Sequence, residues 1–124
     1  MNNNRPVNLD LSTLRFPVMA IASILHRIAG IVIFLLLPFM LYYLDYSLRG
    51  ATFFQAIEVF FDKPLIKFVL WVFSSALTYH IIAGVRHIIM DLGFGEGLEN
   101  ARLGAILVIT LATLSVVGLG VWIW

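Results

Sequence analysis

The chain has 124 residues, of which 61% are hydrophobic and only 12% carry a charge. Because a soluble domain has about a quarter charged residues, most of the surface of this chain is expected to face lipid. The net charge of +1 gives no reason to expect nucleic-acid binding, and the lack of cysteine excludes disulfides and iron–sulfur clusters bound by this chain alone.

The polar start of the chain, residues 1–17, does not read as a signal peptide. It lacks the charged start, the apolar run and the small-residue cleavage site of such a peptide, so the first apolar span is expected to remain in the mature protein. Residues 9–17 mix apolar and charged side chains. They predict a short amphipathic segment at the membrane interface, after which Pro17 begins a helix.

Three apolar segments are long enough to cross a membrane as helices, at about residues 18–44, 64–92 and 103–124. The connection between the first two is rich in phenylalanine and is expected to form a short helix lying on the membrane. The Gly-rich, acidic residues 93–100 are expected to form a turn. The sequence therefore predicts an all-α integral membrane protein: one transmembrane domain over residues 1–124, with three transmembrane helices and a short amphipathic N-terminal segment.

Basic residues flank the three spans unequally, which predicts their orientation. Five lie on the side of the N-terminus and three on the opposite side: Arg5, Arg15, Arg27, Arg86 and Arg102 against Arg49, Lys63 and Lys67. Because basic residues concentrate on the inner side of a membrane, the N-terminus is predicted to lie inside and the C-terminus outside. In a bacterial inner membrane these sides are the cytoplasm and the periplasm.

A polar face interrupts the first span. Ser23, His26 and Arg27 have the spacing i, i+3, i+4 and so share one face of a helix, which Gly30 extends by one turn. Ionisable side chains inside a span are costly, so their presence is a hypothesis about function. Ser23 can donate a hydrogen bond to a quinone carbonyl. Arg27 can stabilise the negative charge that develops on its reduction, or bind a haem propionate.

A second polar stripe follows the second span. His80, Gly84, His87 and Asp91 have the spacing i, i+4, i+7, i+11, and His80 lies about 16 Å of helix from Asp91. This depth suits a buried imidazole that binds haem iron, with Gly84 leaving room for a flat macrocycle. His87 would lie near the level where propionates emerge, and Asp91 either orients His87 or is a solvated residue at the helix end.

Simpler hypotheses remain open from these residues alone. A membrane histidine often only hydrogen-bonds a neighbouring helix, and Arg27 can be an anchor that snorkels to the interface. The chain can also be a small transporter or channel subunit, although no span has a carboxylate at its middle, which disfavours a proton pump. A purely structural anchor is a third possibility. Haem content separates these classes from a cytochrome.

A haem held by two imidazoles needs two facing histidines. Within this chain His26 and His80 are the only candidates, and counting along the two spans separates their depths by several ångströms. The second ligand is therefore expected from a partner subunit, and a three-span bundle of this size also buries little by itself.

The order and spacing of these residues resemble the larger cytochrome b membrane-anchor subunit of bacterial succinate dehydrogenase, complex II. The resemblance covers nearly the whole chain. It is carried by Arg-Pro-Val-Asn-Leu-Asp-Leu at residues 5–11, Arg-Phe-Pro at 15–17, Ser-x-x-His-Arg at 23–27, and His-x-x-x-Gly-x-Arg-His at 80–87 with Met-Asp at 90–91.

The resemblance implies a haem b whose iron has His80 as one axial ligand, with the other ligand supplied by a smaller anchor subunit. It also implies a ubiquinone site lined by Ser23 and Arg27, to which Ile24 between them is assigned as well. His26 and Arg27 are expected near the haem propionates, and the residues near the haem further include Gly84 and His87.

The resemblance further implies the partners and the reaction. A flavoprotein subunit, an iron–sulfur subunit and a second small haem-ligating anchor would complete the complex in the bacterial inner (cytoplasmic) membrane. Electrons from succinate oxidation would pass from the iron–sulfur subunit to ubiquinone, in the respiratory chain and the tricarboxylic acid cycle. This chain would not bind succinate, and no activity is expected from it in isolation. A fumarate reductase anchor, which runs the reverse reaction with menaquinone, is the alternative.

Overall fold

A computed structural model describes residues 16–95 and 97–124, nearly all of them helical and none of them in a strand. The helices are α1 (Val18–Ser47), α2 (Ala51–Phe61), α3 (Pro64–Asp91) and α4 (Leu98–Ile123). Of these, α1, α3 and α4 are long and apolar enough to cross a membrane. The prediction of an all-α fold with three such helices is confirmed. The predicted amphipathic segment lies outside the described residues except for Phe16 and Pro17.

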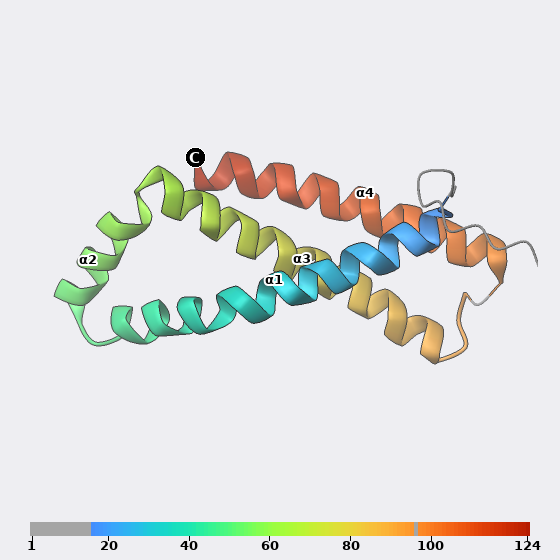
Figure 1. Cartoon of the computed structure of the whole chain (residues 1–124), viewed down its shortest axis with the longest axis horizontal. Helices are drawn as coiled ribbons and strands as arrows, with labels where there is room; N and C mark the ends of the chain where they lie inside the picture. Colours follow the sequence, from blue (N-terminus) through green and yellow to red (C-terminus); the bar gives the residue numbers. More distant parts are fainter. Residues whose placement is uncertain (1–15, 96) are drawn as a thin grey trace, which may run out of the picture.

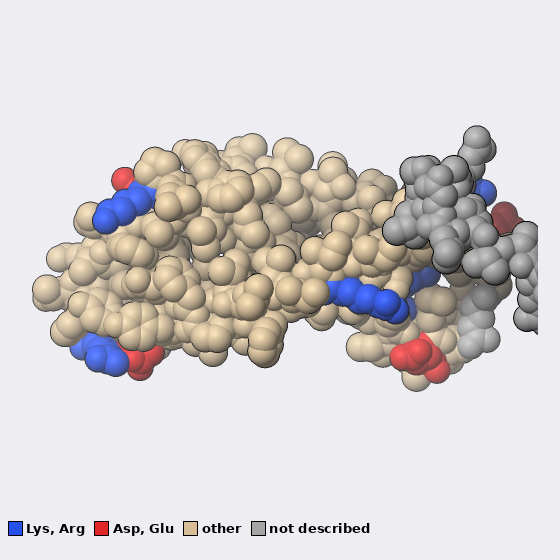
Figure 2. Space-filling view, in the orientation of Figure 1, with Lys and Arg blue, Asp and Glu red and all other residues tan. Residues whose placement is uncertain are grey.

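The three long helices exceed the thickness of the lipid hydrocarbon. They have 30, 28 and 26 residues, or about 45, 42 and 39 Å, against about 30 Å of hydrocarbon. Charged side chains gather toward the two ends of the molecule and leave an uncharged band between them on the face shown in Figure 2. The helix α4 begins at Leu98, five residues before the predicted apolar span, because the charged residues that precede this span are helical too.

The long helices run alternately up and down (Figure 1). One end of the bundle holds the start of α1 and the turn between α3 and α4, and we call it the α3–α4 end. The other end, the α2 end, holds α2 and the C-terminus. The three long helices all pack against one another, and α3 has the most extensive contacts with the other two.

Small side chains form the contacts between these helices. Among residues 16–95 and 97–124, the buried residues are six alanines and one valine, namely Ala22, Ala29, Ala83, Ala101, Ala105, Val108 and Ala112. Small residues let helix backbones approach closely, which is how helices associate where lipid removes the hydrophobic drive. The large apolar side chains point outward instead, and many are more than half exposed. Lipid or other subunits must cover them.

The sequence also determines how α3 ends. Gly93 has a φ of 84°, in the left-handed region that favours glycine. The amide of Gly93 donates to the carbonyl of Met90 at 2.9 Å, and the amide of Phe94 donates to that of Ile89 at 3.2 Å. These two bonds form a Schellman motif, which satisfies the last carbonyls of the helix. The expected turn is therefore present and begins where the glycines begin.

Aromatic side chains hold α2 against the end of α1. The ring of Tyr43 stacks on Phe60 with centroids 4.8 Å apart and meets the edge of Phe61 at 5.6 Å. Tyr46 meets the edge of Phe53 at 5.0 Å. The short helix expected in this connection is present, and the tyrosines at the end of the first span contact it.

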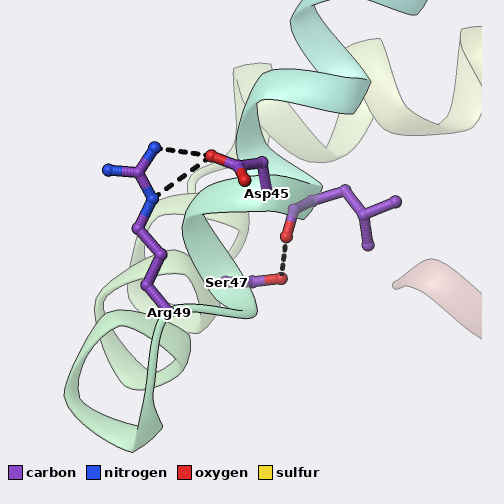
Figure 3. Close-up of polar contacts among 4 residues, drawn as sticks. Asp45, Ser47 and Arg49 are labelled. Carbon is purple, nitrogen blue, oxygen red and sulfur yellow. Dashed lines mark hydrogen bonds and ion pairs between the residues drawn. The ribbon is translucent and has the colours of Figure 1, made fainter.

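An exposed ion pair lies where α1 passes into α2 (Figure 3). Arg49 bends back to Asp45, one turn earlier, with 2.6 Å between its guanidinium and the carboxylate. This hydrogen bond raises the pKa of Arg49 above its ordinary value. The hydroxyl of Ser47 donates to the carbonyl of Leu44 at 2.7 Å. Both contacts are local, so they shape this turn without joining the long helices.

A side-chain donor joins α3 to α4 near the α2 end. The indole Nε1 of Trp71 donates to the backbone carbonyl of Val116 at 3.0 Å. Gly120 lies one turn beyond Val116, and a Cβ on it would be 3.4 Å from that indole nitrogen. The missing side chain of Gly120 therefore leaves the carbonyl of Val116 accessible to the indole.

Replacing Trp71 by phenylalanine tests this contact. Trp71→Phe keeps an aromatic ring but removes the donor, so the protein should lose about 1 kcal/mol of stability and its melting temperature in detergent should fall. Arg49→Gln, which breaks only the exposed ion pair, should leave the melting temperature unchanged. Equal melting temperatures for Trp71→Phe and the unmutated protein would contradict the role given to this bond.

Candidate functional site

Three imidazoles from two helices form a stack between α1 and α3. The ring of His26 stacks on His80 with centroids 4.0 Å apart and an interplanar angle of 24°. The ring of His26 also stacks on His87, with centroids 5.0 Å apart and an interplanar angle of 21°. The structure therefore brings together three of the residues predicted near the haem, one from α1 and two from α3. We call them the imidazole stack.

The arrangement corrects the depth estimated from sequence for two of these residues. Counting from the ends of the spans separated His26 and His80 by several ångströms, but their rings are in van der Waals contact. The count assumed that α1 and α3 begin and end at the same level, whereas packing sets the relative height of two helices. The rings meet face to face, so no macrocycle fits between them, and these two histidines do not bind one iron from opposite sides in this arrangement.

The ring of His80 is held by the backbone of α1. Its Nδ1 lies 3.2 Å from the carbonyl oxygen of His26, and because a carbonyl only accepts, the bond requires the proton on Nδ1. Gly30 borders the same ring, since a Cβ on Gly30 would lie 3.2 Å from Cε1. The neutral ring then has its free lone pair on Nε2.

Gly84 and His87 complete this part of the site. A Cβ on Gly84 would lie 3.9 Å from Nε2 of His26, so the space left by Gly84 faces α1. The Nδ1 of His87 donates to the carbonyl of Ala83 in its own helix at 2.7 Å. Among the described residues Asp91 makes no ion pair with His87, so in this structure the backbone orients that ring.

Tyr79 is a contact that the sequence analysis missed. Its hydroxyl donates to the carbonyl of Ala22 at 2.9 Å and so ties α3 to α1 beside the imidazole stack. The position next to His80 was visible in the sequence, but a tyrosine inside a span does not reveal which helix its hydroxyl reaches.

The three residues predicted to bind quinone lie at the edge of this cluster, on α1. Arg27 and Ile24 are exposed and Ser23 is half-buried. Arg27 forms no ion pair with any residue that the structure describes. The uncharged part of α1 between Arg27 and Asp45 is about 27 Å long. This length is close to the ~30 Å thickness of the hydrocarbon. The guanidinium of Arg27 is therefore near one membrane boundary and available to a ligand or partner.

Arg86 points away from the imidazole stack. Its guanidinium donates to the carbonyl of Ala101 in α4 at 3.0 Å, and a Cβ on Gly104 would lie 3.2 Å from its Nε. That Nε is buried and has no hydrogen-bond partner among the described residues. The adjacent residues Arg86 and His87 of α3 thus contact different neighbours: the side chain of Arg86 contacts α4, and that of His87 contacts α1.

Similarity to known proteins identifies the family of this chain. The family described as succinate dehydrogenase/fumarate reductase transmembrane subunit matches residues 1–119. The chain is 43% identical to the succinate dehydrogenase cytochrome b556 subunit of Coxiella burnetii, with 100% of each chain covered. The chain belongs to this family. The family resemblance seen in the sequence is therefore confirmed, and the three long helices are those of a transmembrane subunit.

More distant members extend the likeness beyond one group of organisms. The chain is 32% identical to the succinate dehydrogenase cytochrome b560 subunit of Reclinomonas americana, over 92% of this chain and 83% of that one. It is 30% identical to the cytochrome b556 subunit of Paracoccus denitrificans, over 80% and 76% of the two chains. Since each relative is covered over most of its length, the likeness concerns the whole transmembrane subunit rather than one helix.

Proposed function

We propose that this chain is the larger cytochrome b anchor of a bacterial succinate:ubiquinone oxidoreductase. It would act as one transmembrane domain that binds haem b together with a second anchor and helps to form the ubiquinone-reduction site. Electrons would reach that site from the iron–sulfur subunit, and succinate would be oxidised on the flavoprotein. This chain would have no activity in isolation, because its residues serve only the haem and the quinone.

The observation that carries the proposal is the imidazole of His80, held between two spans in a subunit of this family. A backbone carbonyl binds its Nδ1 at 3.2 Å, which leaves Nε2 as the metal-binding nitrogen. A metal-bound histidine commonly donates its other ring N–H in this way, and the donated bond fixes the tautomer and the ring orientation. His80 is therefore prepared to act as an axial ligand of haem iron.

A second observation fits the haem. The Nε2 of His26 is buried and has no hydrogen-bond partner among the described residues. Such a group is costly inside a membrane protein unless a partner satisfies it. A haem propionate beside His26, with Arg27 and His87 near the boundary, would supply that partner, and Gly84 would keep the approach open. The haem itself supplies a one-electron carrier within the membrane.

Ser23, Ile24 and Arg27 would hold the quinone. The hydroxyl of Ser23 would donate to one carbonyl oxygen of the ring, and Ile24 would contact its apolar part. The guanidinium of Arg27 would stabilise the negative charge that develops on the reduced oxygen, because charge-assisted hydrogen bonds are the strong ones. Its exposure and its lack of an ion pair with any described residue support this role, since both leave the guanidinium available to a ligand or another subunit.

The exposed surface supports the presence of partners. Large apolar side chains cover the outside of all three long helices, and the stacked rings of His26 and His80 leave no space for iron between them. The second small anchor would supply the other axial ligand. In the bacterial inner membrane, the excess of basic residues would keep the α3–α4 end on the cytoplasmic side, where the iron–sulfur and flavoprotein subunits would bind.

The family description also covers fumarate reductase subunits. That alternative would use the same site in reverse, with menaquinone. The names of the relatives reported above all favour succinate dehydrogenase. A transporter or a purely structural anchor would contain no haem, so the haem spectrum tests those hypotheses.

Substituting Arg27 tests the quinone site. Arg27→Leu in the assembled complex should lower quinone reduction at least 100-fold, on the scale of removing one oxyanion donor, and leave succinate oxidation by a soluble dye unchanged. Arg49→Leu, an exposed arginine at the α2 end, should change neither activity. If both activities fell equally in Arg27→Leu, the substitution would act on assembly and the assignment of Arg27 would be wrong.

Substituting His80 tests the haem ligand. The reduced-minus-oxidised absorption spectrum of the purified complex should contain a b-type α-band that shifts or disappears in His80→Leu, because the iron loses a ligand. Tyr79→Phe, which only loosens the neighbouring contact between α1 and α3, should keep the band in place. An unchanged band in His80→Leu would remove His80 from the ligand role. A purified, unmutated complex with no b-type band would contradict the cytochrome proposal itself.

A further inference from the structure

We infer that Gly30 is a positioning residue for the haem ligand, acting through the carbonyl of His26 on the imidazole of His80. The inference rests on the proposed function, in which His80 binds the iron. Gly30 would not touch the iron. It would determine how closely the ring of His80 approaches α1, and so the strength of the hydrogen bond on the far side of the ring from the metal.

The contacts around the ring support this role. The carbonyl oxygen of His26 lies 3.2 Å from Nδ1 of His80. A Cβ on Gly30 would lie 3.2 Å from Cε1 and 3.6 Å from Nδ1 of the same ring. The first of these distances is shorter than an ordinary van der Waals contact between carbon atoms. Any side chain at position 30 would therefore push the ring away from the carbonyl.

Helix geometry explains why position 30 has this effect. The carbonyl of His26 also accepts the helical hydrogen bond from the amide four residues later, which is that of Gly30. A carbonyl oxygen has two lone pairs, so it can accept a second bond from the side. In a helix the side chain at i+4 lies beside the carbonyl of residue i. Glycine leaves that oxygen uncovered.

The same arrangement occurs independently on α4. The indole of Trp71 donates to the carbonyl of Val116, and a Cβ on Gly120, four residues later, would lie 3.4 Å from the donor nitrogen. Two glycines on two helices thus stand in the same relation to a donor from α3. In both cases the glycine leaves room for a ring that donates the bond. The hydroxyl of Tyr79 and the guanidinium of Arg86, which are not rings, reach carbonyls that have His26 and Ala105 four residues later.

The hydrogen bond would matter to the iron. A strong acceptor on Nδ1–H makes Nε2 a better electron donor, which stabilises the oxidised iron and lowers the midpoint potential. The ring of His26, stacked on His80 at 4.0 Å, also limits rotation of the ligand. Gly30 would thereby influence both the potential of the haem and the orientation of its axial imidazole.

The test is Gly30→Ala in the assembled, purified complex, with potentiometric titration and electron paramagnetic resonance of the haem. The ring should move by a few tenths of an ångström and lose most of its bond to the carbonyl. We expect haem content equal to that of the unmutated complex, a more positive midpoint potential and shifted g values. Gly118→Ala is the matched control, because a Cβ there meets nothing within 4 Å, and both haem properties should stay unchanged.

Unchanged potential and g values in a haem-containing Gly30→Ala complex would overturn the inference and leave His80 as a ligand. This result would not decide the proposed function, which is tested by whether the unmutated complex contains haem. Should the Gly30→Ala complex not assemble, a cryo-electron microscopy map of the unmutated complex decides. Iron on Nε2 of His80 with Nδ1 in hydrogen-bonding range of the His26 carbonyl supports the inference. Nδ1 farther than about 3.5 Å from that oxygen overturns it.

Discussion

Hydrogen bonds from side chains of α3 to backbone carbonyls of its neighbours hold the long helices in register. Trp71 and Arg86 reach carbonyls of α4, and Tyr79 and His80 reach carbonyls of α1. Inside lipid no water competes for these donors, and an unsatisfied one is costly. Because the acceptors already take part in helical hydrogen bonds, the contacts need only close approach. Glycines and alanines allow that approach, so the small residues and the long donors act together.

This constraint explains why the imidazole stack exists. Once Tyr79 and His80 are bound to successive turns of α1, the height of α3 relative to α1 is fixed, and the ring of His26 meets that of His80. The same close packing leaves no volume for large side chains between the helices, so these point outward. A subunit built this way has small apolar residues and a few side-chain donors between its helices and large apolar side chains outside, which fits the proposal that it shares a haem with a neighbouring anchor.

The sequence was sufficient for those features that depend on one helix at a time. Hydropathy predicted three spans, and the spacing of His80 and His87 predicted that both lie on one face of α3. Features that depend on two helices were not accessible. The contact between His26 and His80 depends on relative height, and the direction of Arg86 depends on which neighbour offers an uncovered carbonyl. Neither leaves a periodic signal, because each depends on close contacts between residues of two different helices.

The two ends of the bundle differ in their ion pairs. At the α2 end Asp45 binds Arg49 at 2.6 Å and Asp62 binds Lys67 at 2.7 Å, whereas Glu58 and Lys63 form no ion pair with any described residue. At the α3–α4 end Arg27 makes no ion pair with any residue in the described part of the chain. Charges that neutralise each other need nothing further from outside. An unmatched, exposed cation near the membrane boundary is available to an anionic or strongly polar ligand, which agrees with the role proposed for Arg27 toward the quinone.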